Sequence, residues 1–369
     1  MTTRRRGQVG RRSFLRTAAT AAVGAGVLGP RHGWPQETDD SQPPPPAAPP
    51  RRRLGRTGLE VSTISFGGIQ IQHERLLDVA IDRGINLVHT APGYGGGRSI
   101  QLFGRVMKRR RDEVFLALKQ SPVGGIDREL EALQTDRVDI LVPPLQSVAE
   151  VDDAGLAEAF LRLKEQGKIR FSGFACHANQ PTVIARAVDL GFFDVMLVAY
   201  NLANRDELDP LLARAGAEQD MGVMAMKTTK DLRPGDHGAA FRSLLATAAV
   251  HTLLVGMSTF GDIEAGVAAV ARTTGWLDRL QLREYAHLPA TACSFCGACD
   301  VCPRGVAVPD ILRCGVYLER GERELAAATY GALGGRGLAQ CMDCGACEAS
   351  CPRQRPVRAE LRRVHRALA

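Results

Sequence analysis

Residues 195–201 read VMLVAYN and residues 222–226 read GVMAM, and a stretch with helical spacing separates the two runs. Almost every position in both runs is apolar, so neither run has a polar face. Strands of this kind are typical of a parallel sheet that helices cover on both faces. Six further short runs share the pattern: residues 61–68, 86–91, 114–119, 138–143, 169–177 and 252–258.

Between these runs lie stretches whose apolar residues recur at about 3.6 positions, as on one face of a helix. Three of them, residues 75–83, 156–166 and 182–190, are each followed by a glycine, which often ends a helix. Eight strand–helix units in residues 54–276 predict an α/β fold, a (β/α)₈ TIM barrel. An open doubly wound sheet is the alternative, although no G-x-G-x-x-G follows the first run.

The chain before the barrel divides into two regions. Residues 11–16 read RRSFLR, which resembles the twin-arginine export motif, and a short, weakly apolar stretch follows. For residues 1–35 we therefore expect a signal region that engages the twin-arginine translocon, with the mature protein in the periplasm or at the cell envelope exterior. A basic disordered tail is the alternative. Residues 36–53 are proline-rich and predict an extended linker.

The charge distribution argues against nucleic acid as a partner. The net charge is +7, but six arginines in the first 16 residues supply most of it, and the rest of the chain carries only about +1. A basic cluster near the C-terminus predicts a solvated helix face or a docking surface for an acidic redox partner. No apolar run reaches the roughly 18 residues of an ordinary spanning helix, so we expect no stable membrane span.

Residues 277–369 predict a ferredoxin-like module, because they contain two cysteine runs of similar spacing. The runs are Cys293-x₂-Cys296-x₂-Cys299-x₂-Cys302-Pro and Cys341-x₂-Cys344-x₂-Cys347-x₃-Cys351-Pro. Three thiolates at this spacing suit one [4Fe–4S] cluster, and the fourth, before proline, ligates the other cluster in two-cluster ferredoxins. The first set is Cys293, Cys296, Cys299 and Cys351. The second set is Cys341, Cys344, Cys347 and Cys302.

Two other uses of these cysteines are open. Zinc commonly binds C-x₂-C pairs, and an exported protein could form structural disulfides. Gly297 and Gly345 would let each loop bend and would leave backbone N–H groups free for cluster sulfides. Cys314 and Cys176 fall outside the pattern, and we expect Cys314 to be a buried, small apolar residue in a helix.

Motifs along residues 51–275 resemble those of the aldo/keto reductase superfamily. They are RLGRTGLEVS at residues 53–62, Thr90-Ala91-x-x-Tyr94-Gly95, Lys119, Gly173-Phe174, His177, Tyr200-Asn201, Met226-Lys227 and Gly256-Met257-Ser258. The cysteine module, with Pro303-x-Gly305-Val306, resembles the ferredoxin-containing branch of that superfamily. The resemblance implies a (β/α)₈ barrel and NADPH-dependent carbonyl reduction.

The resemblance also implies roles for residues at the barrel mouth. Tyr94 matches the family's proton donor, and Lys119 matches the lysine that lowers the pKa of that tyrosine. The positions of the family's aspartate and histidine carry His89 and Pro144. His89 is then either a new acid or base or a buried, satisfied imidazole. The candidate catalytic residues are Tyr94, Lys119 and His89.

For a nicotinamide cofactor, the resemblance points to Gly256, Met257 and Ser258. Other contacts depart from the family, because Ala175-Cys176 stands in place of Ser-Asn and Leu197 in place of a glutamine. NADP(H) therefore remains a possible cofactor with fewer polar contacts than the family offers.

These observations together predict an iron–sulfur oxidoreductase. Two [4Fe–4S] clusters would exchange electrons with a small molecule, or another cofactor, at the barrel mouth. One alternative is a non-enzymatic electron carrier whose barrel is a retired scaffold and whose partner is a redox protein. Another is an NAD(P)H-dependent carbonyl reductase with altered catalytic residues.

Overall fold

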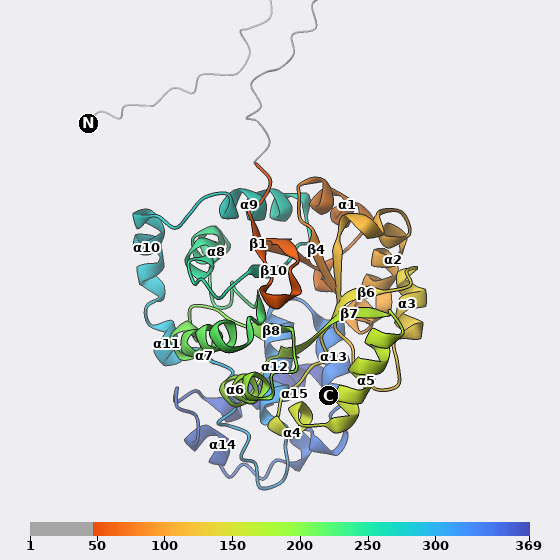
Figure 1. Cartoon of the computed structure of the whole chain (residues 1–369). Coiled ribbons are helices and arrows are strands. Elements are labelled where there is room, and N and C mark those ends of the chain that lie inside the picture. Colours follow the sequence, from red (N-terminus) through yellow and green to blue (C-terminus); the bar gives the residue numbers. More distant parts are fainter. Residues whose placement is uncertain (1–46) are drawn as a thin grey trace, which may run out of the picture. The chain divides into compact units, whose positions relative to one another are not determined.

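Eight parallel strands close into a barrel in the computed structural model, which describes residues 47–369 (Figure 1). The strands are β3 (Ile64–Gly67), β4 (Leu87–Thr90), β5 (Phe115–Leu118), β6 (Val138–Leu141), β7 (Ile169–Cys176), β8 (Val195–Ala199), β9 (Gly222–Met226) and β10 (Thr252–Gly256). Strand β10 pairs with both β9 and β3, and this second pairing closes the ring. The predicted TIM barrel is confirmed and the open doubly wound sheet is wrong.

Helices cover the outside of this barrel (Figure 1). They are α1 (Glu74–Asp82), α2 (Arg98–Arg110), α3 (Asp127–Leu133), α4 (Val148–Val151), α5 (Ala154–Glu165), α6 (Gln180–Leu190), α7 (Arg205–Gln219), α8 (His237–Leu245) and α9 (Phe260–Val270). The three glycines predicted to end helices, Gly84, Gly167 and Gly191, have φ of 86°, 68° and 66°. This left-handed conformation carries no Cβ penalty in glycine, so these predictions hold.

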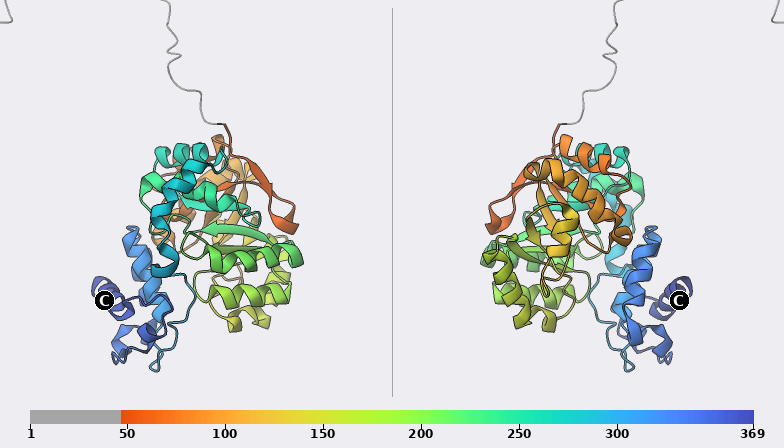
Figure 2. Two further views of the ribbon diagram at one scale, coloured as in Figure 1. Left: turned by 90° about the vertical axis from the view of Figure 1, so that its left-hand side faces the viewer. Right: turned by 90° about the vertical axis from the view of Figure 1, so that its right-hand side faces the viewer.

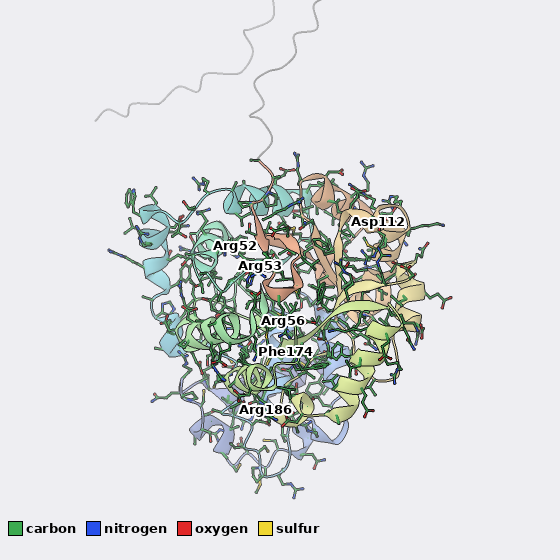
Figure 3. All side chains as sticks on the ribbon, viewed as in Figure 1. Arg52, Arg53, Arg56, Asp112, Phe174 and Arg186 are labelled. Carbon is green, nitrogen blue, oxygen red and sulfur yellow. The ribbon has the colours of Figure 1, made fainter. Side chains whose placement is uncertain are left out.

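The chain enters the barrel through a two-stranded hairpin that the sequence did not indicate. β1 (Arg51–Arg53) pairs antiparallel with β2 (Glu60–Ser62), so the predicted run 61–68 is divided between β2 and β3. Arg52, labelled in Figure 3, donates to the carbonyl oxygens of Val250 at 2.5 Å and Leu245 at 2.7 Å. These distant acceptors hold the arginine run against the barrel, which corrects its assignment to the linker. The predicted signal region and residues 36–46 lie outside the described residues.

The barrel wall has an apolar layer on each side. On the outside, Phe174 of β7 lies 5.2 Å, centroid to centroid, from Phe193, within the large core between strands and helices (Figure 3). On the inside, Leu87, Ile140 and Leu197 belong to a second cluster that fills the barrel. Side chains of alternate strand positions therefore fill both layers, as parallel barrel strands require.

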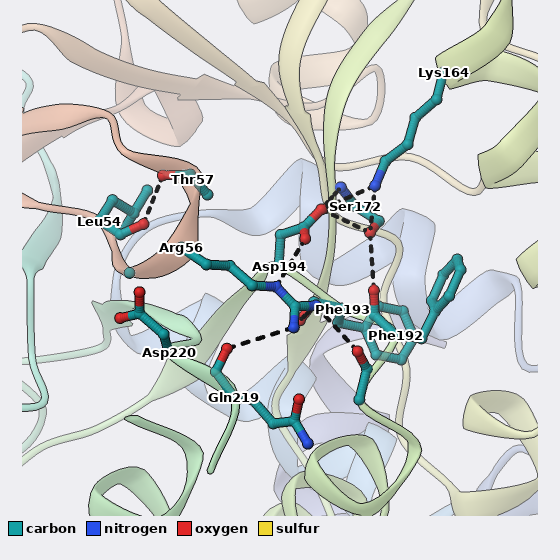
Figure 4. Close-up of polar contacts among 12 residues, drawn as sticks. Leu54, Arg56, Thr57, Lys164, Ser172, Phe192, Phe193, Asp194, Gln219 and Asp220 are labelled. Atoms are coloured by element: carbon teal, nitrogen blue, oxygen red, sulfur yellow. Dashed lines mark hydrogen bonds and ion pairs between the residues drawn. The ribbon is translucent and has the colours of Figure 1, made fainter. Parts of the chain in front are cut away.

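Polar groups at the N-terminal ends of the strands form a connected network (Figure 4). Asp194, just before β8, accepts from Arg56 at 3.0 Å, from Lys164 at 2.9 Å and from the backbone N–H of Ser172 at 2.9 Å. The Ser172 hydroxyl adds a contact of 3.0 Å to the same carboxylate. Arg56 also donates to the carbonyl of Phe193 at 2.8 Å, which ties the hairpin to the barrel bottom.

The cysteine-rich region folds into short helices that pack together on one side of the barrel, drawn in blue in Figure 2. They are α12 (Val308–Glu319), α13 (Arg323–Gly331), α14 (Ala346–Ala349) and α15 (Val357–Leu368). Before them come α10 (Trp276–Leu282), which packs against α8, and α11 (Leu288–Thr291). Their core includes Ile311, Leu361 and the fully buried Cys314, whose predicted place in a helix is confirmed. Residues 47–369 belong to one compact unit, so the module packs against the barrel.

No helix between residues 47 and 369 combines the length and the apolar character needed to cross a bilayer.

Candidate functional site

A cavity of about 980 Å³ lies at the C-terminal ends of the barrel strands, and we call it the mouth cavity. Its barrel side is lined by residues at or just after β3, β4, β7, β9 and β10, including Gly67, His89 and Gly256. Its other side is formed by the module, through Tyr317, Arg320 and Glu322. Catalytic sites of TIM barrels lie at this end of the strands.

Tyr94 and His89 line the mouth cavity together. Tyr94 belongs to a 3₁₀ turn, η3 (Tyr94–Gly97), and its ring centroid lies 5.9 Å from that of His89 on β4. No hydrogen bond joins the Tyr94 hydroxyl to Lys119 in the described chain. Burial raises the pKa of Tyr94 well above its ordinary value, and Tyr317 and Glu322 add to the rise. In this structure the hydroxyl is therefore held protonated.

The imidazole of His89 is neutral and has an unused nitrogen. Burial, and then the charge of Lys119, lower the pKa of His89 to about 3. Its Nε2 is buried without a hydrogen-bond partner in the described chain. The expectation of a satisfied imidazole is therefore wrong. A buried nitrogen without a partner lowers the stability of the fold by about 1–3 kcal/mol. His177 resembles it, since burial lowers its pKa and its Nδ1 also has no partner among the residues described.

Two lysines follow strands on opposite sides of the barrel, β5 and β9. Lys119 comes directly after β5, and burial, together with the charge of Arg313, lowers its pKa to about 8. Lys227 comes directly after β9 with a φ of 58°, and its Nζ lies 4.7 Å from the ring centroid of Tyr317. Burial also lowers the pKa of Lys227. Of the two, Lys227 lines the mouth cavity, and a lysine with a lowered pKa in a cavity is typical of functional sites.

The module residues at the mouth were not predicted from the sequence. Helix α12 ends in a Schellman turn, in which the N–H of Glu322 donates to the carbonyl of Tyr317 at 2.9 Å and the N–H of Gly321 to that of Leu318 at 3.1 Å. Gly321 adopts the required left-handed conformation, with a φ of 74°. The turn therefore fixes Tyr317 and Glu322 side by side. Gly321 after an apolar helical stretch could have indicated the turn, but not what it faces.

The predicted nicotinamide contacts are present only in part. Gly256 and Ser258 line the mouth cavity, but the Met257 side chain is fully buried in the core. The N–H groups of Ser258 and Thr259, at the start of α9, already donate to Asp262 at 2.8 and 2.9 Å. A carboxylate at this helix terminus opposes a phosphate there.

The strand positions that departed from the family offer no replacement contacts. Leu197 is fully buried in the barrel interior, and the Cys176 thiol donates a hydrogen bond to the carbonyl of Ala178 at 3.1 Å. The residues present thus fit NADP(H) poorly.

The two cysteine runs adopt the same backbone conformation. Between the first and second cysteines, Phe295 and Asp343 have φ of 60° and 56°, and after the second cysteine Gly297 and Gly345 have φ of 78° and 79°. Repeated left-handed residues turn successive N–H groups toward one side and make a concave anion site. Because a cluster with its four thiolates is anionic, this backbone fits a [4Fe–4S] cluster.

The thiols meet in the crossed sets that the spacing predicts. Burial raises the pKa of Cys299 to about 12, and its neighbours Cys293, Cys296 and Cys351 add to the rise. Cys302 lines a second cavity, of about 20 Å³, with three cysteines of the other run. These three are Cys341, Cys344 and Cys347. Each run thus sends its fourth cysteine to the other run.

All the cysteines in residues 47–369 are free thiols. No three His, Cys, Asp or Glu side chains within this part of the chain converge on one point as ligands of a single metal ion would.

The first cysteine run is inserted into the barrel mouth. Phe295 joins the apolar cluster inside the barrel, and its carbonyl accepts from the N–H of Gln180 at 3.4 Å. A Cβ on Gly297 would lie 1.4 Å from Oδ1 of Asn179, so only glycine fits there. A cavity of about 120 Å³, the first cysteine cavity, is lined by Cys293 and Cys299 and by α12.

Comparisons with known proteins give the same kind of barrel. The aldo/keto reductase family model matches residues 67–231, from the end of β3 to the loop after β9. The oxidoreductase YqkF of Bacillus subtilis, described as uncharacterized, is 27% identical over 185 residues, which are 43% of this chain and 60% of the relative. The chain thus spans less than two thirds of that relative.

Solved structures support the fold. The holo form of an aldo-keto reductase from Bacillus halodurans matches with a TM-score of 0.57 at 22% identity, over 67% of this chain and 99% of that one. An aldo-keto reductase from Klebsiella pneumoniae in complex with NADPH gives 0.53 at 20% identity, over 67% and 98%. The family model and the relative make this chain similar to aldo/keto reductases, and the solved structures share its barrel fold. About a third of this chain lies outside the structural matches.

Proposed function

We propose that this aldo/keto reductase-type barrel is an iron–sulfur oxidoreductase, in which two [4Fe–4S] clusters exchange electrons with a small molecule in the mouth cavity. The main support for this proposal is that the mouth cavity and the first cysteine cavity share a wall. His177, Lys230 and Asp231 line both the mouth cavity and the first cysteine cavity. A cluster held by the first cysteine set would therefore lie next to a molecule in the mouth.

The two cysteine sets differ in exposure, which gives the proposed path a direction. Cys293 and Cys299 are partly buried beside the barrel, whereas Cys341 and Cys344 are exposed. Iron–sulfur clusters supply one-electron transfer at potentials that their surroundings set. The exposed set would meet a redox partner protein, and the partly buried set would face the small molecule. Export by the twin-arginine route, which accepts folded proteins that carry cofactors, belongs to the same proposal.

Iron and sulfide counts on anaerobically purified full-length protein, with an electron paramagnetic resonance spectrum, test the clusters directly. We expect two [4Fe–4S] clusters per chain. Cys351→Ser should remove about half of the iron and change the spectrum of only one cluster, because it takes one ligand from the first set. Cys314→Ala, in the module core, is the matched control and should keep all the iron. A colourless preparation without labile sulfide would refute the proposal.

Reoxidation kinetics separate an enzyme from an electron carrier. Chemically reduced protein is mixed with a panel of carbonyl compounds and quinones, and the cluster absorbance is followed. The proposal predicts saturable reoxidation by at least one small molecule. If only protein partners reoxidise the clusters, the chain is an electron carrier with a retired barrel.

NAD(P)H-dependent carbonyl reduction is a second candidate, favoured by the volume of the mouth cavity. The neighbour from Klebsiella pneumoniae was solved with NADPH, and about 980 Å³ is at the large end for a ligand pocket. Two features argue against NADP(H) binding: the Asp262 carboxylate at the start of α9 and the buried Leu197. Titration with NADPH, followed by the cofactor fluorescence, decides the question, and no saturable change below millimolar concentration would exclude it.

A further inference from the structure

Several carboxylates line the mouth cavity, and Glu322 differs from the others in having no side-chain partner within residues 47–369. Asp231 is paired with Lys230, Glu319 lies 2.7 Å from Arg363, and Asp262 caps α9. Glu322 is partly buried, and its Oε2 is fully buried without a hydrogen bond within residues 47–369. A buried carboxyl oxygen without a partner costs about 1–3 kcal/mol or more, so the structure must gain from its place.

Cations from the barrel and from the module surround this carboxyl. Lys119 follows β5, Lys227 follows β9 and Arg320 directly follows α12, and the charges of all three act on Glu322. None of them lies within 4.0 Å of the carboxylate in the described part of the chain. Two neutral groups, Tyr94 and Tyr317, also interact with the Glu322 charge, and the neutral His89 and His177 line the same cavity. Glu322 is thus a carboxyl group that has no partner within residues 47–369 and lies near several cations.

The charge of Glu322 acts on both lysines. Burial lowers the pKa of Lys119 and of Lys227, and in each case Glu322 works in the opposite direction. Burial also raises the pKa of Glu322 itself, and Lys227, Arg320 and Lys119 oppose that rise. The geometry of the Schellman turn, rather than an ion pair, holds the carboxyl at this place.

We propose that Glu322 is a positioning residue that the cysteine module supplies to the barrel site, where it is the counter-ion of Lys119 and Lys227. The site is then composite, because the barrel provides the lysines and the module provides their carboxylate. The module therefore sets the charge of the mouth cavity in addition to carrying cysteines. This inference rests on the proposed function only in that both use the same cavity.

Competitive labelling of lysines tests the inference without any substrate. Full-length protein, purified anaerobically, is treated with trace acetic anhydride across a pH series, and acetylation of Lys227 and Lys119 is quantified by mass spectrometry. Since only the free amine reacts, the midpoint of labelling reports the lysine pKa. In Glu322→Gln the midpoints of both lysines should shift to lower pH, whereas Glu322→Asp, which keeps the charge, should retain most of the wild-type value.

The control is Glu319→Gln, which removes a carboxylate that lines the same cavity but is paired with Arg363 at the surface. We expect its lysine midpoints to equal those of the wild type. Equal midpoints in Glu322→Gln and the wild type would overturn the inference. So would a shift of the same size in Glu319→Gln. Because the assay depends neither on electron transfer nor on a bound molecule, its failure is distinct from a failure of the proposed function.

Discussion

Charged and imidazole side chains at the two ends of the barrel differ in how many hydrogen-bond partners they have. At the bottom, the Asp194 carboxylate accepts four hydrogen bonds, from a lysine, an arginine and Ser172 (Figure 4). At the mouth, His89, His177 and Glu322 each keep a buried polar atom without a partner in the residues described. A satisfied network stabilises a fold, whereas unpartnered groups lower its stability and are retained where a ligand uses them.

Asp194→Ala should produce the largest loss of stability, because it breaks the bottom network. The substitution leaves the Ser172 N–H and the charges of Arg56 and Lys164 without their partner. We expect the free energy of unfolding to fall by about 4 kcal/mol, as for other partly buried charge networks that lose one member. Urea unfolding under anaerobic conditions measures it.

Asp136→Ala is the control for this substitution. The side chain of Asp136 is 81% exposed and forms an ion pair with Arg137. Such a pair contributes about 0–1 kcal/mol. Burial alone would raise the pKa of Asp194, but hydrogen bonds from Lys164 and Ser172 hold it below its ordinary value. The network therefore stabilises the fold above the unfolded pKa of about 4 and loses strength as the pH falls below it. If Asp194→Ala and Asp136→Ala cost the same, the contrast between the two ends fails.

Gly297→Ala should have the second largest effect, because it disturbs the seat of the cysteine run in the mouth. The new Cβ would displace Asn179, whose side-chain amide donates to Gln146 at 2.8 Å, and alanine is strained at a φ of 78°. We expect a loss of about 3 kcal/mol from the clash and the strain together. Urea unfolding and the iron content measure the effect.

Gly305→Ala isolates the strain, since Gly305 has a φ of 69° but no atom within 4 Å of its Cβ position. It should cost only about 1 kcal/mol. The double variant Gly297→Ala with Asn179→Gly removes the clashing side chain and should recover part of the loss. Equal losses for Gly297→Ala and Gly305→Ala would show that the close approach to Asn179 does not hold the run.

The parts that sequence could predict are those with a local pattern. The strands follow from apolar runs, and the crossed cysteine sets follow from spacing and the prolines after Cys302 and Cys351. Strand β1 was missed because Arg52 finds its acceptors near residues 245 and 250, about 200 positions away. Glu322 was missed for the same reason, since it meets Lys227 only after the module packs on the barrel. When a site residue depends on packing between distant parts of the chain, the sequence around that residue does not reveal its role.

His89→Phe should have the smallest effect on the free energy of unfolding. Unlike Asp194→Ala, it should not make the protein less stable. The ring of His89 is 2% exposed, and its pKa is lowered to about 3, mainly by burial. Between pH 6.5 and 3 the unfolded chain therefore binds a proton that the folded chain does not, so this group makes stability fall as the pH falls. From pH 7 to pH 5 the loss due to His89 is about 2 kcal/mol.

In His89→Phe the free energy of unfolding should thus fall less between pH 7 and pH 5 than in the wild type, by about that amount. An apolar ring in place of an unpartnered nitrogen should also make the variant at least as stable at pH 7. His73→Gln, which removes an exposed imidazole, should leave the wild-type pH dependence unchanged. Urea unfolding at the two pH values measures all three chains. An unchanged pH slope in His89→Phe would mean that the mouth satisfies this imidazole, and the two ends of the barrel would then be alike.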